Sequence, residues 1–435
     1  MSKKKEINFA LLGFGKLGTG FFDIWMNKKD KIQEQTGFNL VLKKILIKNK
    51  HFKRPVKNLD KNLITTDLDD ILNDPDIQIV IDVMGGIEPT FTIIKKIINS
   101  KKHVISANRA LLASKMHELA ELGNINKTYI FPEPSLGGGI PIISALQRDL
   151  IANRITSVTG ILSGTSNFIL SEMTEKQISL KEALQSQEII KIGESLSIID
   201  YDGSDAAQKV AILAAASFGV EVNFLSIFAE GISDITEFDI RCAEDFGYRF
   251  KLLAILRDHP DSFEIRVHPT LVPRDHPLNS VKGRYNAYYI MTDLLGDYMI
   301  YGKGVGIEST SSLLLRDIVE IGTRLYHRPT KVNYQLSWNN KPVLPIKEIQ
   351  TSYYLRFPCV DKPGVIGQIA NILGQYSINI GSAHAEVDKK ANNDSFGFVH
   401  IFVDNSKEKD IHEALDKIRE LDIIKDRIKL FRILD

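Results

Sequence analysis

The chain is poor in cysteine. Only two cysteines occur among 435 residues, Cys242 and Cys359, and neither belongs to a CxxC or a Cys/His spacing. This pattern argues against a disulfide framework and against a structural zinc site. Two isolated thiols are typical of proteins from a reducing compartment, so we expect a cytoplasmic location.

The sequence also lacks an excess of one charge and lacks long apolar runs. Lys and Arg number 55 against 54 Asp and Glu, which gives a net charge of +1. Nucleic acid is therefore not expected as a partner, because its binding needs a concentrated basic surface. No apolar signal segment follows the lysine-rich start, and no stretch is long enough to cross a bilayer. We expect no membrane partner.

The length and the pattern of short apolar runs indicate several domains. A chain of 435 residues is too long for one ordinary core and predicts two or three domains. Strand-like runs alternate with helical stretches at residues 7–12, 40–47, 77–84 and 103–107. This alternation predicts an α/β fold with a Rossmann-type, doubly wound parallel sheet. Glycine-rich loops and longer helices from about residue 133 predict a second, α+β domain.

The C-terminal part reads as a separate small domain. A connector rich in proline and asparagine precedes it, and the segments after residue 350 follow the order βαββαβ, which predicts a ferredoxin-like domain. The predicted boundaries are residues 1–132, 133–326, 327–349 and 350–435.

Charged residues occur in an unusual place near the middle of the chain. Asp205 and Lys209 lie four residues apart in the apolar run 204–218, so on a helix they share one face. The helix is apolar nearly all round and should be buried, where such charges are rare unless paired or functional. Two interpretations remain open, a group for proton chemistry and a solvated ion pair.

A glycine-rich turn follows the first predicted strand and precedes a predicted helix. This order is typical of a dinucleotide-binding loop, in which glycine backbone and a helix N-terminus receive the pyrophosphate. A plain glycine-rich turn is the alternative. The end of the second predicted strand carries Lys48 in a basic run with no acid before Asp60, which favours NADP, with NAD as the alternative. The loop consists of Gly13, Phe14, Gly15, Lys16, Leu17 and Gly18.

Further loops place ligand-type residues where parallel strands end. Glu133 precedes three consecutive glycines, whose backbone can approach a ligand or present carbonyls to a cation. Gly85-Gly86 and Asn108-Arg109 follow the third and fourth predicted strands, at the edge where such sheets bind ligands. Each of these loops alone is also compatible with a structural turn.

Over nearly its whole length the chain resembles the homoserine dehydrogenase family. The resemblance rests on the first glycine loop and on linked motifs in the same order. Its tail resembles an ACT domain, an amino-acid-sensing module, through Asp361-Lys-Pro-Gly364 and Ile378-Asn379-Ile380. The other matching segments are residues 83–89, 106–113, 133–142, 160–170, 203–209, 267–273 and 301–306.

The resemblance implies an enzyme that interconverts L-homoserine and L-aspartate 4-semialdehyde in threonine and methionine biosynthesis. It implies that residues 1–132 bind the dinucleotide, that residues 133–326 bind substrate and form a homodimer or homotetramer, and that residues 350–435 bind an amino-acid effector, threonine first. Lys209 would donate and accept the proton, with Asp205 beside it. The other implied assignments are Glu194 and Asp200 for the substrate ammonium, the backbone around Glu133, Leu136, Gly138 and Ile140 for a monovalent cation, expected to be sodium, and Gly364 and Asn379 for the effector.

The sequence departs from the family pattern at a few positions. Arg109 stands where the family has lysine, Ser163 replaces an asparagine, Ser309 replaces a proline, and residues 193–197 are about two residues short. Arginine stabilises negative charge but does not relay protons. These departures keep one alternative open, a catalytically weakened homologue that acts as an amino-acid-sensing ACT protein.

Overall fold

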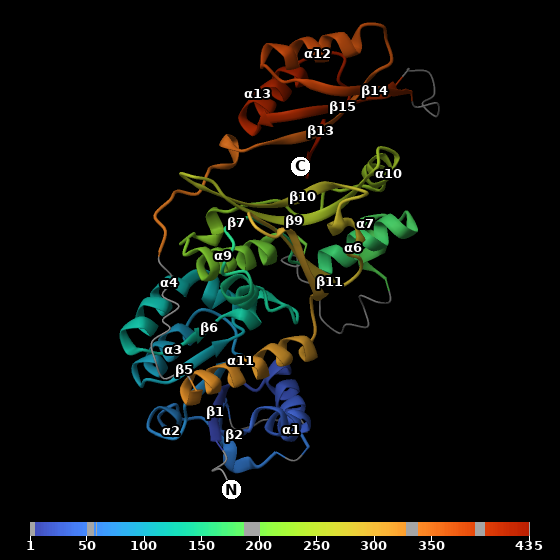
Figure 1. Cartoon of the computed structure of the whole chain (residues 1–435). Helices are drawn as coiled ribbons and strands as arrows, with labels where there is room; N and C mark the ends of the chain where they lie inside the picture. Colours follow the sequence, from blue (N-terminus) through green and yellow to red (C-terminus); the bar gives the residue numbers. More distant parts are fainter. Residues whose placement is uncertain are drawn as a thin grey trace. The chain divides into compact units, whose positions relative to one another are not determined.

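The chain folds into two compact units in the computed structural model (Figure 1). The structure describes residues 5–49, 56–57, 59–186, 201–327, 338–387 and 396–434. Unit 1 comprises Met1–Thr165, Ser204–Ile227 and Arg284–Lys341, and unit 2 comprises Ser166–Gly203, Phe228–Gly283 and Pro342–Asp435. Each unit is thus built from segments that are far apart in the sequence.

Unit 1 contains the parallel sheet that the sequence predicts. Its strand order is β3-β2-β1-β4-β5-β6, and the pairs are parallel. Strands β4 and β5 are buried along their whole length, as expected for a sheet covered by helices on both faces. The strands are β1 (Lys5–Leu12), β2 (Phe38–Leu46), β3 (Ile64–Thr65), β4 (Ile79–Asp82), β5 (His103–Ser106) and β6 (Ile130–Phe131).

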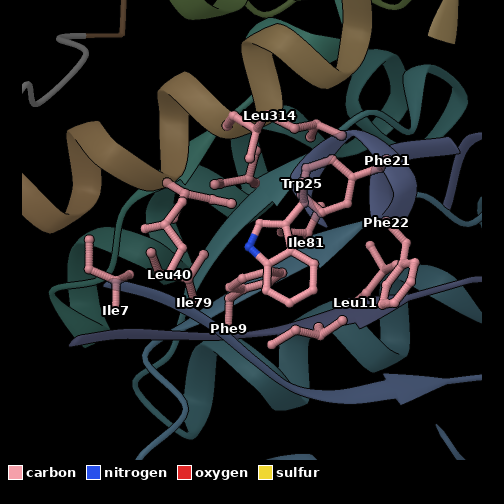
Figure 2. Packing of buried hydrophobic residues seen from close by; sticks show 14 of the residues in the cluster. Ile7, Phe9, Leu11, Phe21, Phe22, Trp25, Leu40, Ile79, Ile81 and Leu314 are labelled. Carbon is pink, nitrogen blue, oxygen red and sulfur yellow. The ribbon is translucent and has the colours of Figure 1, made fainter. Parts of the chain in front are cut away.

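Helices α1 and α11 share one hydrophobic core with this sheet. Figure 2 shows Trp25 of α1 and Leu314 of α11 in the same cluster as the side chains of β1. The rings of Phe9 and Trp25 pack edge to face, with 5.6 Å between their centroids, which is a favoured aromatic geometry. The helices of unit 1 include α1 (Lys16–Thr36), α2 (Asp69–Leu72), α3 (Thr90–Asn99), α4 (Arg109–Asn126), α5 (Ile142–Ser144), α9 (Ser204–Phe218) and α11 (Ile307–His327).

The rest of unit 1 combines three antiparallel strands with α9 and short helical turns. β7 (Ile155–Ile161) pairs with β11 (Tyr285–Thr292), which pairs with β12 (Gly296–Lys303). The buried helix predicted at residues 204–218 is α9, and its bounds agree with the prediction. The short turns are η1 (Lys61–Leu63), η2 (Glu133–Leu136), η3 (Ala145–Asp149) and η5 (Phe224–Ser226).

Unit 2 contains a mixed sheet in the order β9-β10-β16-β13-β15-β14, with β8 beside β10. The strands are β8 (Phe228–Ala229), β9 (Tyr248–Asp258), β10 (Phe263–Pro273), β13 (Gln350–Val360), β14 (Ile380–Val387), β15 (Phe396–Lys407) and β16 (Lys429–Ile433). Helices and turns associated with this unit are α6 (Gly164–Lys176), α7 (Leu180–Leu184), α10 (Glu237–Asp245), η6 (Pro277–Ser280), η7 (Ile346–Glu348), α12 (Val365–Gln375) and α13 (Glu408–Arg419).

The tail has the βαββαβ order that the sequence predicts, in β13, α12, β14, β15, α13 and β16. It has its own apolar cluster, in which Ile369 and Leu373 of α12 and Ile411 and Leu415 of α13 are buried. Its last strand also pairs in parallel with β10, Thr270 with Arg432. The tail therefore shares one compact unit with residues 228–283, and the predicted boundaries at residues 132, 326 and 349 stay predictions.

No helix in the described part of the chain is both long enough and apolar enough to cross a membrane.

Candidate active site

The glycine loop between β1 and α1 has the shape that a dinucleotide needs. Gly13 has φ +94°, and a Cβ on Gly18 would lie 2.4 Å from the Gly13 carbonyl oxygen, so strand and helix pack too closely there for any side chain. A Cβ on Gly15 would meet nothing within 4 Å. Gly15 caps α1 without a side-chain hydrogen bond. Open backbone at the start of a long helix fits a pyrophosphate.

Two neighbouring strand ends are held together at the same edge of the sheet. Asp82 ends β4 and accepts hydrogen bonds from the Met84 amide at 2.9 Å and from the Ser106 hydroxyl at 2.8 Å. Burial raises the pKa of Asp82 to about 6. Asn108 caps α4 and donates to the Gly86 carbonyl at 2.8 Å. These contacts fix the loops that follow both strands.

The buried ion pair of α9 is the chemical centre of the site. Lys209 is 2% exposed and Asp205 7%. The Lys209 Nζ donates to Asp205 Oδ2 at 2.7 Å and to the Leu162 carbonyl at 2.6 Å. The alternative of a solvated surface pair is wrong, because both groups are removed from water. The Lys209 ammonium is thus held in place by at least two protein groups in a site removed from water.

Arg109 extends the ion pair to a second helix. It is the first residue of α4, forms an ion pair with Asp205, and its Nε donates to the Ser135 carbonyl at 3.2 Å. Asp205 therefore lies between two cations, Arg109 and Lys209. A guanidinium keeps its proton, so the contact of Arg109 with Asp205 is electrostatic.

The glycines after Glu133 come close to this lysine. Gly137 has φ +81°, and a Cβ there would lie 3.0 Å from the Lys209 Nζ and 3.1 Å from its Cε. Glycine is needed on both counts, because other residues rarely adopt this φ. The ammonium is thus covered by bare backbone on this side.

Glu133 is 2% exposed and its carboxylate is fully engaged by protein groups. It accepts from the Ile143 amide at 2.6 Å, from the Ser144 amide at 3.0 Å and hydroxyl at 2.7 Å, and from Arg316 at 3.0 Å. Within the described residues, no group of three or more His, Cys, Asp or Glu side chains could hold a metal ion. A cation at this loop would be held by main-chain oxygens, which suits a monovalent ion better than a transition metal.

Two residues that the sequence reasoning missed lie on one face of β11. Asn286 and Tyr288 are both fully buried. The Asn286 Nδ2 donates at 3.1 Å to the same Leu162 carbonyl that holds Lys209. Burial raises the pKa of the Tyr288 hydroxyl, and the Glu133 carboxylate adds to this effect. No local pattern signals their roles, because their partners come from distant parts of the chain.

Other predicted site residues lie apart or outside the described structure. Lys48 is exposed just beyond β2. Gly364 and Asn379 flank opposite ends of α12, an 11-residue helix about 16 Å long, so one chain does not bring them together. Glu194 and Asp200 lie outside the described residues, as does the rest of the basic run at residues 50–54.

Comparisons with known proteins agree with this geometry. Residues 13–133 match the family model "Homoserine dehydrogenase, NAD binding domain", residues 141–319 match "Homoserine dehydrogenase", and residues 353–422 match "ACT domain". The chain is 35% identical to a homoserine dehydrogenase from Synechocystis, with 98% of this chain and 99% of that protein covered. The corresponding protein of Helicobacter pylori is 34% identical, with 99% of both covered.

A solved structure has the same fold throughout. A homoserine dehydrogenase from Thiobacillus denitrificans superimposes with a TM-score of 0.89, at 33% identity and with 99% of both chains covered. The agreement covers the nucleotide-binding sheet, the domain that carries α9 and the tail. The chain therefore belongs to the homoserine dehydrogenase family.

Proposed function

We propose that the protein interconverts L-homoserine and L-aspartate 4-semialdehyde, with Lys209 as its proton donor and acceptor. The observation that carries this proposal is the buried Lys209–Asp205 pair, held at 2.7 Å beside a bare glycine loop. A nicotinamide cofactor, when bound, supplies or accepts the hydride. In the reducing direction Lys209 gives a proton to the oxygen that develops negative charge, and in oxidation it takes that proton back.

The neighbouring residues prepare Lys209 for this task. Asp205 and the Leu162 carbonyl orient the ammonium, and Arg109 holds Asp205 from the other side. The burial of Asp205 and Lys209 excludes water from this pair, which strengthens the electrostatic contact between them. We assign Glu194 and Asp200 to the ammonium group of the substrate on the family resemblance alone.

The test of the reaction is product identification. Purified protein with L-aspartate 4-semialdehyde and NADPH should form homoserine, detected by mass spectrometry, in step with loss of reduced cofactor. The competing function, an amino-acid sensor without turnover, predicts cofactor binding and no homoserine. The intact buried pair speaks against that alternative, because an isolated buried charge pair stabilises a fold little and is costly to keep without a use.

We assign the cofactor preference to NADP, with Lys48 and the basic run that follows it near the 2′-phosphate. The support is the contact between the two loops, since the Gly13 amide donates to the carbonyl of Leu46 at the end of β2. The ratio of kcat/KM for NADPH over NADH should exceed one and should fall as salt screens the charges. Equal use of both cofactors at low ionic strength contradicts this preference.

We place a monovalent cation, expected to be sodium, at the backbone of Glu133, Leu136, Gly138 and Ile140. The loop is fixed, since Glu133 is bound by Ile143 and Ser144 and the Gly139 amide donates to the Lys303 carbonyl at 3.2 Å. Activity should be lower when sodium is replaced by a bulky organic cation at the same ionic strength. Identical rates in both salts contradict the assignment.

We propose a homodimer that forms at the edge strand β12. This strand ends the sheet order, and the β11–β12 hairpin exposes large apolar side chains, which soluble edge strands otherwise avoid. In sedimentation, Leu295→Arg should shift the protein toward monomer, whereas Leu225→Arg, at an exposed site on η5, should not. A wild-type homotetramer that Leu295→Arg dissociates would also support the hairpin as an interface. The exposed residues are Tyr285, Met291, Leu294, Leu295, Tyr298 and Tyr301.

We place an amino-acid effector, threonine first, in a cavity of about 460 Å³ beside Gly364. The cavity lies where β13 turns into α12, so the helix N-terminus faces it and can receive a carboxylate. Gly367 also lines it, and a Cβ there would meet nothing within 4 Å. A side chain at residue 367 should therefore fill the cavity without strain. The other lining residues are Cys359 to Ile366, Ala385, Glu386 and Gly397 to Val399.

A cytoplasmic location agrees with the chemistry of the thiols. Cys242 and Cys359 are both free and buried, and free thiols persist in a reducing compartment. Fractionation of the native cell with an antibody against the chain tests this assignment.

A further inference from the structure

Strand β11 brings a second side chain to the carbonyl that anchors the catalytic lysine. The Leu162 oxygen accepts from the Lys209 Nζ at 2.6 Å and from the Asn286 Nδ2 at 3.1 Å. We propose that Asn286 is the positioning residue of the site: by binding the Leu162 carbonyl it fixes where the Lys209 ammonium points. This inference rests on the proposed function of Lys209.

The sharing of one oxygen explains how Asn286 acts. A carbonyl oxygen has two lone pairs, so with Asn286 on one side the ammonium takes the other. Lysine has a flexible four-carbon stem and three equivalent donors. The contacts to Leu162 at 2.6 Å and to Asp205 at 2.7 Å restrict where the ammonium lies and how it is turned. Loss of the Asn286 contact lets the carbonyl, and with it the ammonium, move.

Stability alone does not account for an amide at this position. Asn286 is fully buried, and its Oδ1 has no hydrogen-bond partner in the described part of the chain. It lies against glycine backbone: a Cβ on Gly304 would be 2.1 Å from this oxygen, and one on Gly164 would be 3.3 Å from it. A buried amide paired on only one side is less favourable than an apolar side chain of similar shape. We therefore attribute the function of Asn286 to its hydrogen bond with the Leu162 carbonyl.

Position 286 is also within electrostatic reach of the lysine. Because both nitrogens contact one oxygen, they lie within the roughly 4–6 Å over which a charge changes a neighbour's pKa. Asp205 on the same helix contacts Lys209 directly, and Arg109 on α4 contacts the same carboxylate. Tyr288, two residues from Asn286 on β11, interacts electrostatically with Arg109 and with Glu133 on η2. A carboxylate placed at 286 adds to this set and favours the charged form of the lysine.

The chain offers a matched control in Asn279. This residue is 3% exposed, its Nδ2 donates to the Pro273 carbonyl at 3.1 Å, and its Oδ1 also has no partner within the described residues. Asn279 belongs to unit 2 and Asn286 to unit 1. Substituting both in parallel separates the loss of a half-paired buried amide from the loss of the contact at Leu162.

The experiment compares Asn286→Ala and Asn286→Asp with Asn279→Ala and Asn279→Asp in homoserine oxidation by the full-length enzyme. Asn286→Ala should lower kcat by about tenfold or more and leave the KM for homoserine and for NADP⁺ within about twofold of wild type. Asn286→Asp should move the acidic limb of the kcat profile to higher pH by about one unit, because oxidation needs the uncharged lysine. The Asn279 variants should change the melting temperature and neither kinetic readout.

Each other outcome decides against the inference. Folded Asn286 variants with wild-type kcat and pH profile overturn it, and so do Asn279 variants with the same kinetic changes. If Asn286→Asp does not fold, the kcat and KM values of Asn286→Ala decide; if neither folds, the role of Asn286 is structural and the inference fails. A wild-type enzyme without homoserine turnover overturns the proposed function as well, whereas the outcomes above leave that function intact.

Discussion

Gly137→Ala is expected to disable Lys209 without unfolding the protein. A Cβ at position 137 would lie 3.0 Å from the Lys209 Nζ and 3.1 Å from its Cε, whereas ordinary contacts between heavy atoms are about 3.5–4.0 Å. The ammonium must therefore move by a few tenths of an ångström. Its hydrogen bonds to Leu162 and Asp205, at 2.6 and 2.7 Å, limit that movement, so at least one of them has to lengthen.

The expected magnitude follows from this displacement. A misplacement of about 1 Å costs roughly 10²-fold in rate, so a shift of about 0.3 to 0.5 Å should lower kcat by roughly 4- to 10-fold, which is about 0.8 to 1.4 kcal/mol of barrier. Gly137 also has φ +81°, and alanine in such a conformation costs about 1–3 kcal/mol of stability. The assay is steady-state oxidation of homoserine, with cofactor binding measured by nicotinamide fluorescence.

Gly37→Ala is the matched control. Gly37 has φ +74°, ends α1, and a Cβ there would meet nothing within 4 Å. This variant should lose stability of about 1 kcal/mol and keep its kcat. If Gly137→Ala retains more than half of the wild-type kcat, or if both variants lose turnover equally, the close approach of Gly137 to Lys209 does not govern the reaction.

Three further perturbations test other parts of the structure. Arg109→Lys should change kcat by less than tenfold, because it keeps a cation beside Asp205, whereas Arg109→Ala should lower kcat by about 10²; a large gain with lysine refutes the electrostatic role. Burial raises the pKa of the Asp317 carboxyl to about 7, above its value of about 4 in an unfolded chain, so the cost of ionising it in the folded state builds up from about pH 4 to about pH 7 and stays at its full value above that. The advantage of Asp317→Asn in unfolding free energy should grow by about 2 to 3 kcal/mol between pH 5 and pH 8, measured by denaturant titration, and a constant advantage contradicts the burial argument. Gly367→Leu should abolish the calorimetric heat of threonine binding, whereas Gly374→Leu, on the same helix with open space around it, should not; no heat with threonine, methionine, lysine or isoleucine for the wild type leaves the tail without an effector role.

Runs of apolar residues in the sequence predicted those helices and strands that are buried along their length. The helix at residues 204–218 appears with those bounds because its apolar residues are contiguous. The strand predicted at 77–84 ends earlier, at Asp82. The Met84 amide donates a hydrogen bond to the Asp82 carboxylate and not to a neighbouring strand. Strands β3 and β6 are two residues each, too short to give a periodic signal, so the sequence predicted four strands of a six-stranded sheet.

The arrangement of the site depended on contacts that no local pattern contains. The motifs predicted the Asp205–Lys209 pair and, separately, Arg109. The contact between Arg109 and Asp205 requires α4 and α9 to pack against each other. Asn286 lies 124 residues from Leu162 in the chain, so the contact between them depends on the pairing of β11 with β7. The cation site predicted at the backbone around Glu133 stays a prediction, and the fold adds that the Glu133 carboxylate accepts hydrogen bonds from the Ser144 amide and hydroxyl.

The central claim is that Lys209 transfers the proton during homoserine turnover. The direct test follows reduction of NADP⁺ by absorbance at alkaline pH with L-homoserine, for the wild type and for Lys209→Met, together with cofactor binding by both proteins. The wild type should reduce NADP⁺. Lys209→Met should bind the cofactor normally, with a kcat at least about 10²-fold lower than that of the wild type. A wild type that binds NADP⁺ without reducing it, or a Lys209→Met variant that keeps more than about a tenth of wild-type turnover, contradicts the claim.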